Sequence, residues 1–223
     1  MIITVGGIKG GSGKTTVSTT LAVLRAVEGR DVLLVDADDQ ETASDFTMLR
    51  TEQQTDGAGY TSIKLSGAAV STDLQLQAPN NDDEVIATGG RATTSQRAAL
   101  TVSDVLLVPF VPRSFDVWTL EKVSQLVGEM RAANPNLQAY AFINRADPRG
   151  QDNAEAEEVI TETDELSLIQ TPLGARKAFG NAAAHGLAVT ELKPQDAKAT
   201  HEMLTLYRHL FDVTTTSKKA VGA

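Results

Sequence analysis

Short apolar runs alternate along the chain with segments in which apolar residues recur every three or four positions. The runs are rich in valine, isoleucine and leucine, and they predict buried strands at residues 2–5, 32–35, 83–86, 105–108 and 139–143. Pro109 follows the fourth run and should end that strand. Because strands alternate with helical segments, the pattern predicts an α/β fold with a doubly wound, mostly parallel sheet and helices on both faces.

Helical spacing marks the segments between these runs. One helix should span residues 14–28 and stop at Gly29. Another should begin near Ser114, a plausible N-cap, and a long one should follow Pro194. Residues 53–66 are polar and contain glycine, which indicates a loop or the edge of the sheet. The helix after Ser114 should bury Val117, Leu120, Val123, Val127 and Met130.

The length of 223 residues suits one domain with a sizeable core. We expect a single domain over residues 1–213 and a disordered tail over residues 214–223. No run of about 18 apolar residues predicts a membrane span. The chain opens directly on a strand and its loop, so we expect no signal peptide and a cytoplasmic protein. The absence of cysteine excludes disulfides and thiolate metal sites.

The formal net charge of −9 argues against a surface that is basic all over. A local basic patch remains compatible with this charge, because acidic residues concentrate at residues 36–45 and 152–165. The candidates for such a patch are Arg176, Lys177, Lys193, Lys198 and Arg208. The alternative is that each of them is an ordinary solvated cation.

A glycine-rich loop between the first strand and the first helix is the strongest chemical signal. It consists of Gly10, Gly11, Ser12, Gly13, Lys14, Thr15 and Thr16. Glycines let the backbone turn tightly and direct its N–H groups at phosphate oxygens, and the following helix N-terminus favours an anion. Lys14 can reach the terminal phosphates, and Thr15 can offer a hydroxyl to Mg²⁺. A chance glycine turn is the alternative, and the order of strand, loop and helix argues against it.

Carboxylates follow the second predicted strand. Asp36 and Asp38 should face the crevice at the carboxyl ends of the strands, where ligands of parallel sheets bind. Asp36 can hold a magnesium-bound water, and Asp38 can orient the water that attacks a phosphate. The alternative is an acidic turn that caps a helix starting near Thr42. Beside the phosphate loop, the functional interpretation is favoured.

The loop departs from the usual phosphate-binding pattern, because Ile8 stands where glycine is common and Lys9 follows it. With this deviant Walker A loop the chain resembles the ParA/MinD class, and within it the small plasmid-type ParA partition ATPases without an N-terminal DNA-binding domain. The resemblance implies the fold of a P-loop NTPase, with ATP and Mg²⁺ as cofactors. It also implies that Lys9 crosses a dimer interface and contacts the nucleotide of the partner subunit, beside catalytic roles for Lys14 and Asp38.

Further positions match or depart from this family's pattern. Asp36, Asp38 and Gln40 match it, and Asp39 stands where proline is usual. Ala87 occupies the place of the Walker B aspartate that helps to position magnesium. Alanine can neither accept a hydrogen bond from a magnesium-bound water nor offset the charge of the ion. We therefore expect tight ATP binding with slow hydrolysis.

Asn144 lies where the family reads the adenine ring. An asparagine at a strand end offers both a donor and an acceptor to a purine edge. A helix cap or turn is an equally good explanation for this residue. The resemblance continues through residues 176–191 and reaches about Phe211.

The resemblance implies a cargo-positioning or plasmid- or chromosome-partition ATPase. Such a protein forms an ATP-dependent sandwich homodimer, binds DNA nonspecifically and associates with the nucleoid, and a ParB-like or adaptor partner stimulates its hydrolysis. One alternative is an enzyme of the same fold that uses ATP on a small molecule, as dethiobiotin synthetase does. Another is a membrane-associated regulator like MinD, which needs an amphipathic C-terminal helix. The segment 214–223 shows no large apolar face, which disfavours that alternative.

Overall fold

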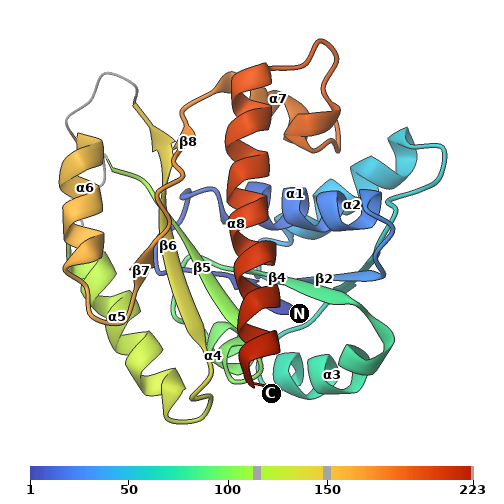
Figure 1. Cartoon of the computed structure of the whole chain (residues 1–223). Helices are drawn as coiled ribbons and strands as arrows, with labels where there is room; N and C mark the ends of the chain where they lie inside the picture. Colours follow the sequence, from blue (N-terminus) through green and yellow to red (C-terminus); the bar gives the residue numbers. More distant parts are fainter. Residues whose placement is uncertain (113–116, 148–151, 222–223) are drawn as a thin grey trace.

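The computed structural model describes residues 1–112, 117–147 and 152–221, and in them a parallel sheet forms the centre of the molecule (Figure 1). The sheet has the strand order β3-β2-β4-β1-β5-β6-β7, and β8 pairs with β6 beyond the end of β7. All of these pairings are parallel. The strands are β1 Ile2–Val5, β2 Val32–Ala37, β3 Thr61–Lys64, β4 Asp83–Thr88, β5 Val105–Phe110, β6 Gln138–Ala146, β7 Ser167–Leu168 and β8 Leu173–Gly174.

Helices cover both faces of the sheet. They are α1 Lys14–Val27, α2 Thr42–Gln53, α3 Ala69–Gln77, α4 Thr94–Leu100, α5 Val117–Arg131, α6 Asp152–Thr161, α7 Lys177–Ala183 and α8 Ala197–Val221, with short 3₁₀ turns at Ala78–Asn80 and Val189–Glu191. Successive residues of β5 face opposite ways, as the pleat of a strand requires. Leu107 joins a core with α1, α7 and α8, and Leu106 joins a core with α5 and α6. The predicted doubly wound α/β fold is confirmed.

Several predicted boundaries need correction. β5 continues through Pro109 to Phe110, although we expected Pro109 to end it. β1 leaves the sheet at Gly6, whose N–H bonds to the carbonyl of Leu107, so β5 has only β6 as a ladder neighbour beyond that point. A missing N–H is tolerated where one neighbour is absent. β4 also runs two residues further than predicted, to Thr88.

The expectations about the end of the first helix, the polar segment 53–66 and the C-terminal tail have separate outcomes. α1 ends near Gly29, whose φ of 79° is the left-handed C-terminal stop that the sequence indicates. The segment 53–66 contains the edge strand β3, whereas α3, β7 and β8 were not predicted. Ser114, the expected N-cap, lies outside the described residues. α8 extends to Val221, across most of the segment expected to be a tail, and the domain boundary at residue 213 stays a prediction.

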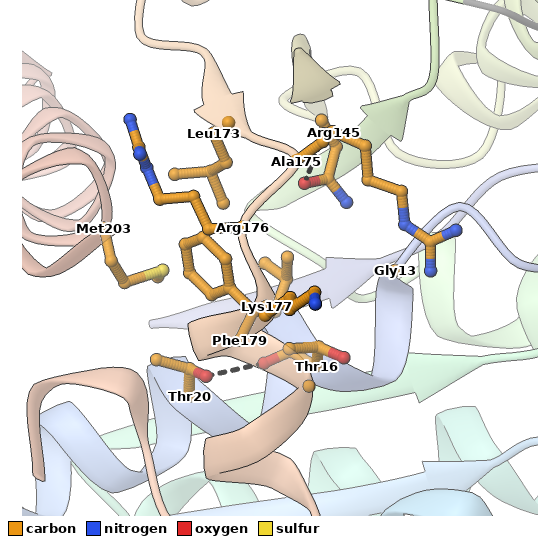
Figure 2. Close-up of a pocket in the computed structure, with 14 residues that line it drawn as sticks. Gly13, Thr16, Thr20, Arg145, Leu173, Ala175, Arg176, Lys177, Phe179 and Met203 are labelled. Carbon is orange, nitrogen blue, oxygen red and sulfur yellow. Dashed lines mark hydrogen bonds between the residues drawn. The ribbon is translucent and has the colours of Figure 1, made fainter. Parts of the chain in front are cut away.

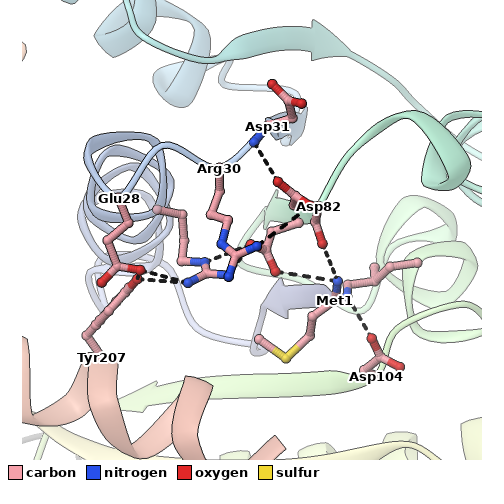
Figure 3. A network of polar contacts seen from close by, with 10 residues as sticks. Met1, Glu28, Arg30, Asp31, Asp82, Asp104 and Tyr207 are labelled. Atoms are coloured by element: carbon pink, nitrogen blue, oxygen red, sulfur yellow. Dashed lines mark hydrogen bonds and ion pairs between the residues drawn. The ribbon is translucent and has the colours of Figure 1, made fainter. Parts of the chain in front are cut away.

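A polar network fastens α8 to α1 and β4 at the amino-terminal edge of the sheet (Figure 3). Arg25 forms an ion pair of 2.6 Å with Asp83 and another of 2.8 Å with Glu28. Tyr207 of α8 donates a hydrogen bond of 2.6 Å to Glu28, and Phe211 places its ring 4.3 Å from the guanidinium carbon of Arg25. α8 is therefore held by charged and aromatic contacts in addition to its apolar face.

In the described part of the chain, no helix has both the length and the apolar character that crossing a bilayer would require.

Candidate nucleotide site

The glycine-rich loop joins the end of β1 to the start of α1. A Cβ atom added at Gly10 or Gly11 would meet nothing within 4 Å, so this part of the loop faces open space. At Gly13 a Cβ would lie 2.3 Å from Nδ2 of Asn144, and the φ of 94° there is left-handed. Gly13 is thus required by the packing beneath the loop, whereas Gly10 and Gly11 leave room for a ligand.

The ammonium group of Lys14 is directed into the loop. It donates a hydrogen bond of 2.8 Å to the carbonyl oxygen of Lys9, and the residue is only 6% exposed. Burial lowers the pKa of Lys14 from its usual value, and the negative charge of Asp38 opposes this shift. A buried cation that has one carbonyl partner is well prepared to accept phosphate oxygens.

Asn144 supports the loop from below. Its Nδ2 donates a hydrogen bond of 2.6 Å to the carbonyl oxygen of Ser12, and its Oδ1 accepts one of 3.0 Å from the N–H of Arg145. Both ends of the amide therefore have partners within the protein. The predicted contact of Asn144 with adenine stays a prediction, and the geometry gives the residue a role in holding the loop.

Two hollows lie on either side of the loop. The larger has a volume of about 350 Å³ and the smaller about 130 Å³. The larger one suits a drug-sized ligand such as a nucleoside. The smaller is lined by the outer part of the loop from Gly7 to Ser12 and by β5 and α5. Residues that line the larger hollow opposite the loop are Leu173, Gly174, Ala175, Arg176, Lys177, Phe179 and Met203 (Figure 2).

The carboxylates at the carboxyl end of β2 lie beside this loop. Asp36 is 3% exposed, and its Oδ2 accepts hydrogen bonds of 2.8 Å and 2.9 Å from the N–H and Oγ of Ser44 in the first turn of α2. Asp36 thus serves the capping role considered as the alternative. Asp38 is half-buried, and a Cβ added at Gly89 would lie 3.0 Å from its Oδ1. The glycine is what lets the segment after β4 approach Asp38.

Ala87 lies in β4 in register with Asp36 of β2 and with Val5 of β1. It is 2% exposed, so a larger side chain there would point into a closed space next to Asp36. Among the described residues, no group of three or more histidine, cysteine, aspartate or glutamate side chains could hold a metal ion. The hydroxyl of Thr15 and the carboxylate of Asp36 are hard oxygen donors of the kind that Mg²⁺ binds, and the ion would need phosphate oxygens and water beside them.

The segment after β4 also reaches the phosphate loop. A Cβ added at Gly90 would lie 2.7 Å from the backbone nitrogen of Gly10. Only glycine allows so close an approach of two backbones. The three segments that follow the adjacent strands β1, β2 and β4 therefore meet at the carboxyl edge of the sheet.

A family model described as the CobQ/CobB/MinD/ParA nucleotide binding domain matches residues 3–189. The chain belongs to this family.

Individual proteins agree with this assignment. The maintenance of carboxysome distribution protein A of Halothiobacillus neapolitanus is 26% identical over 202 residues, which cover 90% of this chain and 92% of that protein. A putative plasmid partition protein of Borrelia burgdorferi, solved with AMPPNP, superimposes with a TM-score of 0.69 at 19% identity and covers 97% of this chain and 98% of its own. Cobyrinic acid a,c-diamide synthase of Mycobacterium smegmatis, solved with ADP and magnesium, gives a TM-score of 0.68 at 18% identity over 83% of this chain and 90% of its own. The two structural likenesses concern the fold alone.

Within this CobQ/CobB/MinD/ParA domain, Arg145 follows Asn144 in the segment expected to read adenine, and the sequence alone gives it no role of its own. Its φ of 56° is left-handed, and the pairing of β6 with β8 is irregular between Asn144 and Ala146. Bulges of this kind redirect a side chain and are frequent beside active sites. The side chain extends towards Gly13 (Figure 2), and Arg145 lines both hollows. No local signal in the sequence marks a left-handed arginine, so only the structure could find it.

Proposed function

We propose that this chain is an ATP-dependent partition or cargo-positioning ATPase of the ParA type. The observation that carries the proposal is the glycine-rich loop with the buried Lys14 at its base and a hollow on each side. Phosphates fit against the loop amides and the ammonium group, and the larger hollow has the size for a nucleoside. The carboxysome-distribution relative and the fold shared with a plasmid partition protein support cargo positioning over other uses of ATP.

The roles of the residues follow from their places. Lys14 and the amides of residues 10–16 bind the phosphates, and Asp38 orients the attacking water. Thr15 and Asp36 would hold magnesium, which neutralises charge on the phosphates when it is bound. Lys9 stands at the outer rim of the loop, beside the smaller hollow, from where it can contact a nucleotide in a second copy of the chain.

DNA binding by the ATP-bound homodimer belongs to the same proposal. Arg176 forms an ion pair with Glu202, so it is a poor candidate for contacting DNA. Lys177, Lys193, Lys198 and Arg208 are exposed and remain candidates. Dimerisation brings two copies of any such patch together, which is how an acidic chain can bind a polyanion. A ParB-like or cargo-adaptor protein would stimulate hydrolysis, and the protein would work on the nucleoid in the cytoplasm.

The decisive experiment measures DNA binding with and without ATP, and ATP turnover with and without duplex DNA, at several salt concentrations. The proposal expects ATP-dependent DNA binding that weakens as salt rises, and loss of one phosphate contact should reduce the salt slope by about one. DNA binding that depends on neither ATP nor salt would contradict it. Lys198→Gln and Arg208→Gln test the patch, and Lys122→Gln, at an exposed position on α5, is the matched control.

A small-molecule enzyme is the second candidate, because the fold is shared with cobyrinic acid a,c-diamide synthase. That enzyme class would couple ATP to modification of a metabolite, and DNA would leave its turnover unchanged. Turnover that requires a small carboxylic acid and ignores DNA would therefore favour this candidate over partition.

A further inference from the structure

Glu202 of α8 holds the short segment that connects β8 to α7. Its Oε2 accepts hydrogen bonds of 3.0 Å from the N–H of Gly174 and 3.0 Å from Nε of Arg176, and its Oε1 lies 2.6 Å from Nη2 of Arg176. The carboxylate and the guanidinium thus meet as a two-pronged ion pair, the strongest geometry available to these groups. We call Arg176, Glu202 and the N–H of Gly174 the clamp.

The clamp forms part of the wall of the larger hollow. Gly174 and Arg176 line this hollow, as does Met203, which follows Glu202 on α8 (Figure 2). A Cβ added at Gly174 would lie 3.2 Å from Nε of Arg176, so the arginine folds back closely over the glycine. The side chains of Arg176 and Glu202 are 24% and 21% exposed, which leaves their interaction only partly screened by water.

Besides the apolar packing of Leu173 in the core, the segment has few other attachments among the described residues. β8 contains two residues and pairs only with β6, and one further backbone bond, 2.9 Å from the N–H of Ala175 to the carbonyl of Ala146, continues that pairing. A wall built on so short a strand depends on the side chains that hold it. α8 supplies those side chains from outside the part of the chain, residues 3–189, that the family model matches.

We propose that Arg176 and Glu202 are positioning residues that set the affinity for the nucleoside half of the bound nucleotide. The glycine-rich loop sets the affinity for the phosphate half. The proposal rests on the nucleotide binding proposed above, and it assigns the C-terminal helix a part in that binding. Because such coupling is reciprocal, a nucleoside in the hollow also stabilises the position of α8.

Comparison of two ligands separates the two halves of the site. Calorimetric titration of the full chain with ATP and with inorganic tripolyphosphate, both in excess Mg²⁺, reports the whole site and the phosphate half respectively. Glu202→Ala and Arg176→Ala should each weaken ATP binding by about ten-fold or more and change tripolyphosphate binding by less than about two-fold. The double variant should be no weaker than Glu202→Ala, because loss of the carboxylate already removes both the ion pair with Arg176 and the hydrogen bond from Gly174.

The ion pair between Arg131 and Glu165 provides a matched control far from the hollow. Glu165→Ala should leave the affinity for both ligands unchanged. Glu202→Gln keeps the shape of the side chain and is the second variant in case Glu202→Ala unfolds. It should weaken ATP binding by a smaller factor, about three-fold, and again spare tripolyphosphate.

Each outcome of these titrations either supports the inference or overturns it. Unchanged ATP affinity in the clamp variants overturns the inference, and so does an equal loss for ATP and tripolyphosphate, which would mean general destabilisation. If the unaltered chain binds neither ligand, the proposed function fails and the clamp inference fails with it. Selective loss of ATP affinity supports the inference.

Discussion

The ammonium group of Lys14 donates a hydrogen bond to the carbonyl oxygen of Lys9, so the two lysines of the deviant loop are connected through the backbone of one and the side chain of the other. A nucleotide phosphate would compete with this carbonyl for the ammonium group. We therefore expect nucleotide binding to weaken this bond between Lys14 and the residue that we expect to act on the partner subunit.

Lys14→Ala should weaken ATP binding strongly. Each charge-assisted contact to phosphate that is lost costs about 1.5–3 kcal/mol, or roughly a ten-fold to hundred-fold change in the dissociation constant. Calorimetric titration measures the change, with Lys122→Ala as the control for loss of an exposed lysine. An unaltered affinity in Lys14→Ala would remove this residue from the site.

Lys9→Ala should prevent ATP-dependent dimerisation and leave ATP binding to the monomer within about three-fold of the original affinity, because a residue that acts on the partner contributes to association. Light scattering in the presence of ATP or ADP measures the oligomeric state. We expect a dimer with ATP for the unaltered chain and a monomer for the variant. Dimers of both chains would exclude Lys9 from the interface.

Ala87→Asp should raise ATP turnover at saturating magnesium. The new carboxylate would lie beside Asp36 in a space that is almost fully buried, where two like charges destabilise the protein unless a cation neutralises them. The melting temperature of Ala87→Asp should therefore depend on Mg²⁺ far more than that of the unaltered chain.

Two controls accompany this change. Ala87→Asn has nearly the same shape without the charge, and should not raise turnover. Asp38→Ala should abolish the remaining hydrolysis, because the attacking water loses its orienting group. Turnover in the unaltered chain as fast as in Ala87→Asp would show that another group completes the magnesium shell.

Asn144→Ala should weaken ATP and GTP binding by similar factors, since the amide holds the loop at Ser12 and both nucleotides share the phosphates. A residue that reads adenine would instead change the ratio of the two affinities, because each base offers a different hydrogen-bonding edge. Competition titrations with the two nucleotides measure that ratio. A change of about ten-fold in the ratio would favour the predicted adenine contact over the loop-holding role.

Glu84 makes the stability of the fold dependent on pH. Its two carboxylate oxygens are buried without a hydrogen-bond partner, and burial raises the pKa of Glu84 from 4.5 to about 7, against the opposing charge of the Met1 amino group. The folded protein therefore binds this proton more tightly than the unfolded chain. The free energy of unfolding falls as pH rises from about 4.5 to about 7, by up to roughly 3 kcal/mol from this group.

Glu84→Gln removes the charge and should increase the free energy of unfolding at pH 8, with an advantage that shrinks towards pH 5. Denaturant titrations of both chains at the two pH values measure it. Glu158→Gln, at an exposed position of α6, is the control and should show no such trend. An advantage of Glu84→Gln that is equal at both pH values would contradict the shifted pKa.

Sequence reasoning succeeded where the signal is local. The run of β-branched residues, the glycines and Lys14 fall within 16 residues of the start of the chain, and the structure places them as strand, loop and helix in that order. The structure likewise places Asp36 and Asp38 at the carboxyl end of β2, as their position after an apolar run predicts, while their roles stay predictions. Each of these inferences rests only on residues that are close together in the sequence.

What escaped prediction depends on distant partners. Asn144 reaches Ser12 across 132 residues, and Glu202 reaches Arg176 across 26, so neither contact leaves a pattern in a short window. Pro109 was misjudged because its effect depends on where the neighbouring strand β1 ends. The left-handed backbone of Arg145 coincides with an irregular pairing against β8, a strand too short to be predicted.

The attachment of α8 has a practical consequence for dissecting this protein. The shared family domain ends at residue 189, whereas α8 begins at Ala197 and buries Ala199, Met203, Leu206 and Leu210 against the core. A shortened protein cut at the family boundary would lack α8 and would leave the core surface that α8 covers in water, and such apolar surfaces drive aggregation. The limit of what relatives have in common is therefore not the limit of what this chain needs in order to remain in solution.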